Sequence, residues 1–225
     1  KGIEVHWGEE VEGKRKTPPH QEIVARFANY VNSRKGHGKS VVVTLGATRS
    51  PIDDIRFIQN TSSGSTGFAI ADDLFRHGHD VTCVKGITSV ATPNWLPLII
   101  PADSPSEMLK ELFALTNDNI EAWVHSAAVL DYVVENSAEG KLASQQGPLE
   151  VKLIESPKHI LELTKKCQGS VRIGFKLETG IKQKELVRRA LAQIEYANMT
   201  AVVANRLEDI KDSSKPRAYL VDRTG

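Results

Sequence analysis

The amino-acid sequence predicts an α/β fold in which a mostly parallel sheet carries helices on both faces. Segments of continuous apolar character alternate along the chain with segments of helical periodicity. The run 41–45 is apolar without alternation, which is typical of a strand buried on both faces of a parallel sheet. Strict alternation of strand and helix favours right-handed crossovers between parallel strands.

The first part of the chain is expected to lie outside this fold. Residues 1–19 combine glycines, a basic run at 14–16 and two adjacent prolines, so they are expected to be a tail or linker. The remaining residues, 20–225, are expected to form a single domain, which is an ordinary size for one hydrophobic core. A helix at 21–33 opens this domain, and its apolar face consists of Ile23, Val24, Phe27, Ala28 and Val31.

The later helices follow from capping signals and from helical periodicity. Gly78 suits the end of the second helix, whereas Ser104 and Pro105 suit the start of the third. Ser156 and Pro157 suit the start of the fourth. The second, third, fourth and fifth helices are expected at 66–78, 106–115, 156–166 and 182–197.

Short apolar runs predict the remaining strands, and one polar stretch interrupts them. Residues 133–148 are rich in Ser, Gln, Gly and Glu, and a loop of this length is typical of a functional lid, or flap. The strands that follow 41–45 are expected at 81–85, 98–100, 123–129, 150–154, 171–177, 201–204 and 218–221.

Composition excludes several classes of protein. The chain has 29 basic and 28 acidic residues, so its charge gives no reason to expect nucleic acid as a partner. It has neither an apolar run long enough to cross a membrane nor the apolar region of a signal peptide. Cys83 and Cys167 lie far apart in apolar segments, so reduced thiols and a cytoplasmic location are expected.

The segment after the first strand has the composition of an anion-binding loop. Gly46 follows the strand directly, and Ser62, Ser63 and Gly64 lead into the next helix. Backbone N–H groups at a helix N-terminus bind phosphate oxygens, and Arg56 adds a bidentate cation. An ordinary loop with a helix cap explains the same composition, so both interpretations stay open.

Other residues of interest also lie beyond strand ends, where ligands bind in open α/β sheets. Asp131 follows the small residues Ala127 and Ala128, and it either contacts a ligand or caps a turn. Lys141, in the polar stretch, is either a lid cation that closes over phosphates or a solvated side chain. Phe175 either stacks on a base or belongs to the core.

Several familiar motifs are absent. The string Gly38-Lys39-Ser40 precedes a strand and lacks the upstream glycine of a P-loop. No G-x-G-x-x-G fingerprint surrounds Gly46, and no G-x-S-x-G elbow occurs. Metal ligation is not expected from the scattered histidines, and His125 is expected to be a hydrogen-bonded core residue.

Taken together, these strings resemble the phosphopantothenoylcysteine synthetase family, the synthetase part of the bifunctional coenzyme A biosynthesis flavoproteins. The resemblance covers about residues 40–222. It rests on an ordered series: Gly46-Ala47-Thr48-Arg49-Ser50-Pro51-Ile52-Asp53, Arg56-Phe57-Ile58 with Asn60, Ser62-Ser63-Gly64 with Gly67, Ala127-Ala128-Val129 with Asp131-Tyr132, Lys141, Gly174-Phe175-Lys176-Leu177-Glu178-Thr179, and Ala204-Asn205.

The resemblance implies a modified Rossmann-like fold, a homodimer and a ligase reaction with Mg²⁺. In that family, the carboxylate of 4′-phosphopantothenate attacks the α-phosphate of CTP or ATP, and pyrophosphate leaves. The amine of cysteine then displaces the nucleoside monophosphate from the acyl-nucleotidylate. Which of the two nucleotides this chain uses stays open.

The resemblance also implies roles for particular residues. Lys141 would stabilise charge during nucleotidyl transfer, Asn60 would hold the acyl-nucleotidylate, and Arg56 would support the first step or the neighbouring subunit's substrate. Cationic positions of some relatives fall at Arg189, which keeps the charge, and at Gln193, which loses it. The nucleotide and substrate would bind at Gly46, Ser62, Ser63, Gly64, Ala127, Ala128, Asp131, Pro157, Lys158, His159, Ile160, Phe175 and Arg189.

Two other functions remain alternatives. An NAD(P)-dependent oxidoreductase shares the architecture, but no tyrosine here has a lysine four residues later, as short-chain reductases require. A nucleotide-sensing module would lack the flap cation, so Lys141 argues against it.

Overall fold

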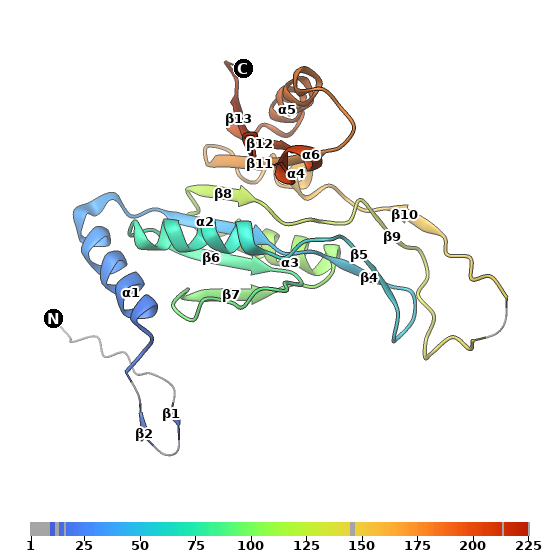
Figure 1. Ribbon diagram of the computed structural model, residues 1–225, viewed down its shortest axis with the longest axis horizontal. Helices are drawn as coiled ribbons and strands as arrows, with labels where there is room; N and C mark the ends of the chain where they lie inside the picture. The colour runs from blue at the N-terminus through green and yellow to red at the C-terminus, as the bar shows by residue number, and fades with distance from the viewer. Residues whose placement is uncertain (1–9, 12–13, 16, 145–146, 213, 225) are drawn as a thin grey trace.

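The centre of the molecule is a seven-stranded sheet with the order β13-β12-β11-β8-β3-β6-β7. The computed structural model describes residues 10–11, 14–15, 17–144, 147–212 and 214–224 (Figure 1). Only β13 is antiparallel to its neighbour, so the predicted mostly parallel sheet is confirmed. The strands are β3 (Ser40–Leu45), β6 (Asp80–Lys85), β7 (Leu98–Pro101), β8 (Ala122–His125), β11 (Val171–Glu178), β12 (Ala201–Arg206) and β13 (Tyr219–Asp222).

The strand order reverses at β3 and β8. From β3 the chain moves outward to β6 and β7, and it then returns to β8 on the other side of β3. From β8 it continues outward to β11, β12 and β13. This is the order of a Rossmann-like sheet, whose ligand crevice lies beyond the carboxyl ends of the two strands where the order reverses.

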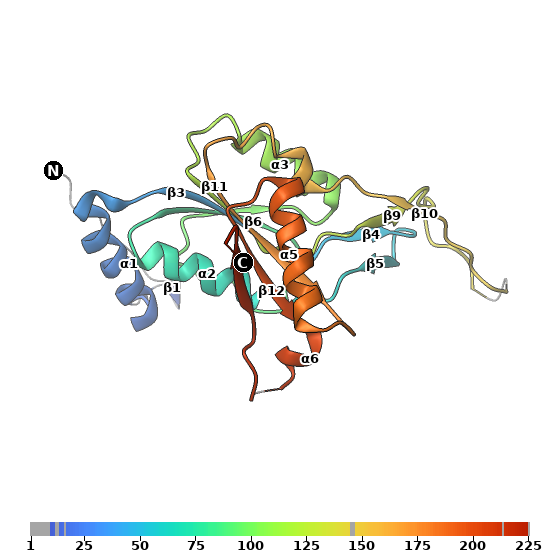
Figure 2. The same ribbon diagram turned by 90° about the horizontal axis from the view of Figure 1, so that it is seen from above.

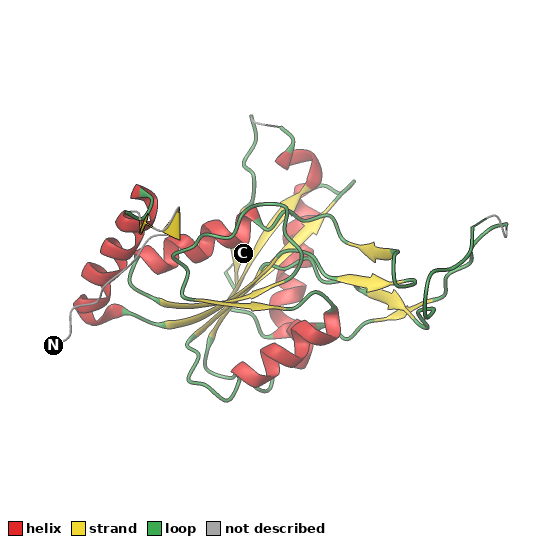
Figure 3. Ribbon diagram, turned by 90° about the horizontal axis from the view of Figure 1, so that it is seen from below, coloured by secondary structure: helices red, strands yellow, loops and turns green. Residues whose placement is uncertain are grey.

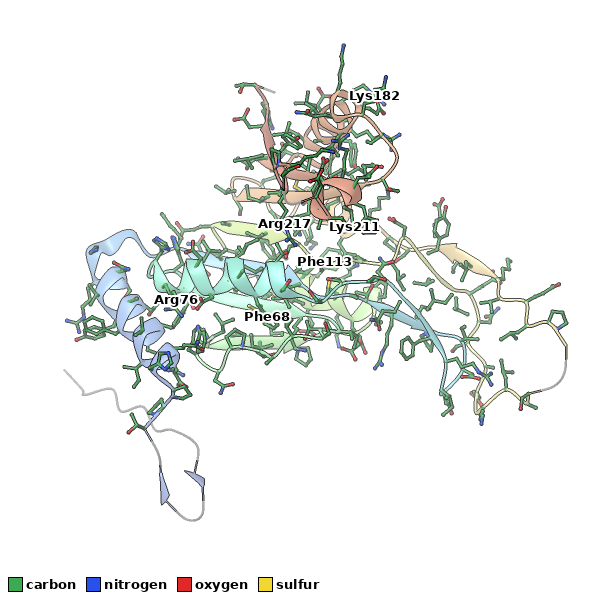
Figure 4. The ribbon with its side chains drawn as sticks, in the orientation of Figure 1. Phe68, Arg76, Phe113, Lys182, Lys211 and Arg217 are labelled. Carbon is green, nitrogen blue, oxygen red and sulfur yellow. The ribbon has the colours of Figure 1, made fainter. Side chains whose placement is uncertain are left out.

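Helices cover both faces of the sheet, as the sequence predicts (Figure 3). One core cluster joins β3 and β6 to Ala25 and Phe68, and another joins the opposite face to Met108 and Leu112. Figure 4 labels Phe68 and Phe113, which come from helices on opposite faces. The helices are α1 (His20–Asn32), α2 (Ser65–Arg76), α3 (Pro105–Leu115), α4 (His159–Glu162), α5 (Gln183–Ala197) and α6 (Leu207–Ile210), with a wide turn η1 (Ser33–His37) after α1.

Two elements end earlier than the sequence predicts. The strand expected at 123–129 ends at His125, because the Ala127 N–H bonds to the Thr44 hydroxyl at 3.2 Å instead of to a backbone carbonyl of β3. The helix expected at 156–166 is α4 alone, and turns follow it to residue 169. Neither change affects the strand order, but both leave irregular backbone at the edge where the strands end.

Two hairpins, which the sequence analysis did not predict, project from this edge as an arm (Figures 1 and 2). Val134 N–H donates to the Ser50 hydroxyl at 2.9 Å and so joins the two hairpins. The strand expected at 150–154 is β10, which belongs to the arm and not to the central sheet. The arm strands are β4 (Arg49–Pro51) with β5 (Phe57–Gln59), and β9 (Tyr132–Val134) with β10 (Leu153–Glu155).

Helix α1 is attached mainly through polar side chains. Asn29 and Asn32 donate to the carbonyls of Phe75 and Arg76, both at 2.7 Å, at the end of α2. Most of the predicted apolar face of α1 is exposed, with Phe27 at 67%.

Within the segment expected to be a tail or linker, β1 (Glu10–Val11) pairs with β2 (Lys14–Arg15). No helix in the described ranges is long and apolar enough to cross a membrane.

The close approach of α2 to β3 gives a testable prediction at Gly67. A Cβ at this position would collide with Leu45 Cβ and lie 2.9 Å from the Ser126 hydroxyl. Glycine to alanine inside a helix ordinarily stabilises by about 1 kcal/mol. We expect Gly67→Ala to destabilise instead, by about 1–3 kcal/mol in urea unfolding, because α2 must move off the sheet. The exposed neighbour Thr66 is the control: Thr66→Ala should change the free energy of unfolding by less than about 0.5 kcal/mol. A stabilised Gly67→Ala would show that the helix has room.

Candidate functional site

A cavity lies beyond the carboxyl ends of the strands, where the strand order reverses. Its volume is about 570 Å³, which suits a nucleotide-sized ligand. The loops after β3 and β8, the end of β11 and the first turns of α2 and α4 contribute to its wall. Every predicted binding residue except Arg189 lies in that wall: Gly46, Ser62, Ser63, Gly64, Ala127, Ala128, Asp131, Pro157, Lys158, His159, Ile160 and Phe175.

A backbone seam closes one side of the cavity by joining the loops after β3 and β8. Ala128 N–H donates to the Gly46 carbonyl at 2.8 Å, and Thr48 N–H donates to the Ala128 carbonyl at 3.1 Å. Leu130 N–H donates to the fully buried Thr48 hydroxyl at 2.9 Å. Gly46 has φ 81°, and a Cβ there would lie 2.7 Å from the Ile87 carbonyl oxygen. The seam therefore depends on glycine at its start.

The N-terminus of α2 faces the same cavity. Its N-cap is Gly64, which has φ 81° and brings no side chain to the first N–H groups of the helix. The hydroxyls of Ser62 and Ser63 accept from Gly64 N–H at 3.4 Å and Ser65 N–H at 3.3 Å, which holds the loop in a tight turn. A glycine-capped helix N-terminus is positive and open to a ligand, so this wall suits phosphate oxygens.

Two buried histidines, His125 and His159, belong to the wall. Burial lowers the pKa of His125 to about 3, and the charges of Arg172 and His159 add to this effect. Burial also lowers the pKa of His159 to about 4, although the Pro105 backbone partly opposes the shift. Within the described chain, His125 Nε2 and both ring nitrogens of His159 have no hydrogen-bond partner of ordinary geometry. Both imidazoles are therefore neutral near pH 7 and costly to protonate.

The buried guanidinium of Arg172 fixes the wall segment that carries His159. Arg172 Nη2 donates to the Ile160 carbonyl at 2.7 Å, and Nη1 donates to the Ala197 carbonyl at 2.6 Å. The Ile160 carbonyl belongs to α4, and the Ala197 carbonyl is that of the last residue of α5, where the helix dipole favours a cation. Arg172 thus ties α4 to α5 through two backbone carbonyls.

The mouth of the cavity carries both signs of charge. Asp131 and Lys158 face each other there, with Oδ1 and Nζ 4.0 Å apart, and both side chains are largely exposed. The cavity is also lined by Phe175 and Lys176 of β11, Ile210 of α6 and Arg217, from the loop before β13. A partly buried ring next to cations can accommodate a base and its phosphates.

The three residues expected to be catalytic lie outside this wall. Asn60 is nearest, because its Nδ2 donates to the carbonyls of Ala128 and Val129 at 3.3 and 3.0 Å. Arg56 and Lys141 lie on the arm, where Arg56 pairs with Asp53 and Lys141 is exposed.

Arg189, the remaining predicted binding residue, lies on α5 outside the wall. Its guanidinium is held by Glu178 and Glu185, both at 2.8 Å. With two carboxylates already on it, this cation carries little free positive charge toward a ligand.

The cavity holds few groups suited to a metal ion. No group of three or more His, Cys, Asp or Glu side chains with metal-binding geometry occurs in the described part of the chain. Asp131 is the carboxylate of the wall, and Mg²⁺ commonly needs only one or two carboxylates when substrate phosphates complete its shell. The chain therefore fits a metal ion that arrives with a triphosphate better than a resident one.

Sequence reasoning missed some of the wall. Arg217 follows no recognisable motif, and only the antiparallel return of β13 brings it to the cavity. His125 was expected to be a core residue with a hydrogen bond, whereas it is buried, lines the cavity and leaves Nε2 unpaired. The sequence did contain one signal that His125 lies near the site, namely its position near the end of a strand, two residues before Ala127.

Comparisons with known proteins agree with this geometry. A sequence profile described as the DNA/pantothenate metabolism flavoprotein C-terminal domain matches residues 36–225. The coenzyme A biosynthesis bifunctional protein CoaBC of Thermococcus kodakarensis is 40% identical over 199 residues, which are 88% of this chain and 48% of that protein. The chain thus spans about half the length of the curated relatives it matches.

Solved structures give the same picture. The C-terminal domain of a coenzyme A biosynthesis bifunctional protein CoaBC is 26% identical with a TM-score of 0.64, covering 75% of this chain and 77% of that one. A Cab2 mutant in complex with phosphopantothenate-cysteine is 18% identical with a TM-score of 0.63, covering 92% of this chain and 88% of that one. At this lower identity the likeness supports the fold alone.

The buried histidines predict how stability depends on pH. Their folded pKa values of about 3 and about 4 lie below the ordinary 6.5, so the unfolded chain binds protons that the folded chain excludes. The free energy of unfolding should have its full value above about pH 6.5. It should fall as the pH drops toward 4, by about 2 kcal/mol per histidine at pH 5.

Urea unfolding at pH 5 and pH 7 measures this effect. His159→Met and His125→Leu should each remove part of the difference between the two pH values, and the double variant should remove most of it. If the double variant keeps the wild-type difference, other groups cause the acid sensitivity.

Proposed function

The chain belongs to the family of the DNA/pantothenate metabolism flavoprotein C-terminal domain, and from that membership we propose that it is a phosphopantothenate–cysteine ligase of coenzyme A biosynthesis. The observation that supports this proposal most is the cavity at the reversal of strand order. There, an open helix N-terminus, a backbone seam and an aromatic side chain meet in one wall. A nucleoside triphosphate needs these same features for its phosphates, sugar and base.

The proposed reaction has two steps that need alignment and charge neutralisation more than a protein nucleophile. First, a carboxylate oxygen of 4′-phosphopantothenate bonds to the α-phosphorus of CTP or ATP, and the bond to the leaving pyrophosphate breaks. Next, the cysteine amine bonds to the acyl carbon, loses a proton, and expels the nucleoside monophosphate. Both steps build negative charge on phosphate oxygens, and fixed donors stabilise such charge.

The chain's own groups suit these tasks. We assign the phosphates to the N–H groups that begin α2 after Ser63 and Gly64, and the base to the space beside Phe175. Asn60, whose Nδ2 is held at the carbonyls of Ala128 and Val129, keeps its Oδ1 on the side away from that pair and can orient the acyl-nucleotidylate. Mg²⁺, carried by the triphosphate beside Asp131, would supply further charge neutralisation.

The arm supports the proposal that the protein works as a homodimer. Large apolar side chains are exposed along it, including Ile55 at 63%, Phe57 at 49% and Tyr132 at 51%. Exposed apolar side chains gathered on one projection are typical of a protein–protein interface. Because Lys141 and Arg56 lie on the same arm, a second copy packed there would bring these cations near a cleft.

A coupled assay tests the proposed function. Pyrophosphate should be released only when nucleotide, Mg²⁺ and 4′-phosphopantothenate are all present, since the first step consumes the nucleotide and 4′-phosphopantothenate and needs Mg²⁺ to neutralise charge. Cysteine should be needed for the amide product and not for the first turnover. Parallel reactions with CTP and ATP identify the nucleotide. Pyrophosphate release without 4′-phosphopantothenate, or no release with either nucleotide, would contradict the assignment.

A further inference from the structure

Asp53 is a fully buried carboxylate within an arm whose other side chains are mostly exposed. Its side chain has 0% exposure, and the Arg56 side chain paired with it has 36%. A carboxylate out of contact with water is costly unless hydrogen bonds and a cation compensate it. Asp53 must therefore be held by a specific set of donors, and those donors indicate what the residue does.

Two different parts of the chain supply these donors. Oδ1 accepts from the N–H groups of Ile55 at 2.9 Å and Arg56 at 2.6 Å, within the turn that joins β4 to β5. Oδ2 accepts from Arg56 Nη1 at 2.8 Å and from Leu142 N–H at 3.1 Å. Arg56 Nη2 donates to the Leu142 carbonyl at 3.2 Å. The carboxylate and the guanidinium together hold both polar groups of residue 142.

Neighbouring backbone contacts extend the same attachment. Asp54 N–H donates to the Gly140 carbonyl at 3.2 Å, and Gly140 N–H donates back to Asp54 Oδ2 at 3.1 Å. Ala138 N–H donates to the Ile52 carbonyl at 2.9 Å. The segment 138–142 is thus fastened to the turn 52–56 at every second residue, and Lys141 lies between two fastened residues.

The charge state of Asp53 fits this arrangement. Burial alone would raise its pKa, but hydrogen bonds from the N–H groups of Ile55, Arg56 and Leu142, together with the Arg56 charge, lower it overall. The group is therefore an anion at neutral pH. An anion with four donors fixes geometry more firmly than a neutral side chain does.

We propose that Asp53 is a positioning residue that mounts Lys141 and Arg56 on one rigid support, here named the clasp and consisting of residues 52–56 and 138–142. This proposal rests on the proposed function, in which a second copy brings both cations near a cleft. The clasp keeps the spacing of the two cations fixed when the arm meets a cleft. A displacement of about 1 Å in a charged group can lower the rate by up to about 100-fold.

The competing explanation is that Asp53 only forms the turn between β4 and β5. The two explanations differ in which carboxylate oxygen of Asp53 they require. The turn uses Oδ1 alone, since Ile55 and Arg56 N–H groups point there. The clasp uses Oδ2. Asp53→Asn keeps an acceptor for the turn but turns an amide NH₂ toward Leu142 N–H and the Arg56 guanidinium, so it should break the clasp and leave the turn.

The test compares turnover of Asp53→Asn with its nucleotide affinity. We expect kcat for pyrophosphate release to fall by about 10- to 100-fold, while the Kd for nucleotide, measured by calorimetry, changes less than about twofold. The matched control is Asp103→Asn, because Asp103 pairs with Arg49 at 2.9 Å outside the clasp. That variant should keep wild-type kcat. Wild-type turnover in Asp53→Asn would overturn the proposal.

A double-mutant cycle with Lys141→Gln distinguishes positioning from general damage. If Asp53 acts through Lys141, the two substitutions together should lower kcat little more than Lys141→Gln alone. Multiplicative losses would contradict the proposal. Lys152→Gln, which removes another exposed lysine from the arm, should leave kcat unchanged in either background.

Two further measurements keep the proposal testable if Asp53→Asn folds poorly or if the wild-type protein is inactive. Gly140 has φ 72° and open space around it, so Gly140→Ala strains the clasp without touching the carboxylate, and kcat should fall severalfold. Gly147→Ala, with φ 84° and the same open surroundings, is its control and should keep kcat.

Amide hydrogen exchange at Leu142 tests the clasp without any activity. Exchange should be faster in Asp53→Asn than in wild type, and unchanged exchange would contradict the clasp. If wild type releases no pyrophosphate, the proposed function fails, and this exchange measurement still decides whether the clasp exists.

Discussion

The backbone seam between the loops after β3 and β8 is the constraint on which the rest of the structure depends. Parallel strands leave unpaired N–H and carbonyl groups where they end, and here those groups bond to each other instead of to water. Ala128 donates to Gly46 and accepts from Thr48, and Thr48 also holds Leu130 through its hydroxyl. The seam continues the β3–β8 pairing past the last strand residues, although the chain on both sides has become irregular. One side of it becomes the cleft, and the other becomes the base of the arm.

The seam separates two sets of groups with different proposed roles, one in the cleft and one on the arm. The cleft side offers backbone donors at the start of α2 and two neutral imidazoles, and the charged side chains of Asp131 and Lys158 lie at its mouth. The arm side offers Arg56 and Lys141, and the clasp around Asp53 connects them. Asn60 stands between the two sides, because its amide bonds to the seam itself at Ala128 and Val129. In the proposed ligase reaction, this arrangement would separate the groups that bind the ligand from the cations that stabilise charge.

The sequence predicted what depends on local pattern and missed what depends on distant contacts. The strand at 41–45 and the helix at 182–197 were predicted within a residue or two, because continuous apolarity and helical periodicity are local properties. The arm hairpins were missed, since their strands have three residues each and the contact that joins the two hairpins, Val134 to Ser50, links residues 84 apart in the sequence. The wall of the cleft was anticipated from the position of Ser62, Ala127 and Phe175 at strand ends. Arg217 was not, because only the antiparallel return of β13 brings it there.

Amide hydrogen exchange with and without saturating nucleotide tests the central claim most directly, namely that the seam and the start of α2 form one nucleotide cleft. Exchange should slow at residues 62–67 and 127–131 when CTP or ATP with Mg²⁺ is bound, while α1, on the far side of α2, should not change. Slowing confined to α1 or to the arm, with none in these two loops, would contradict the account.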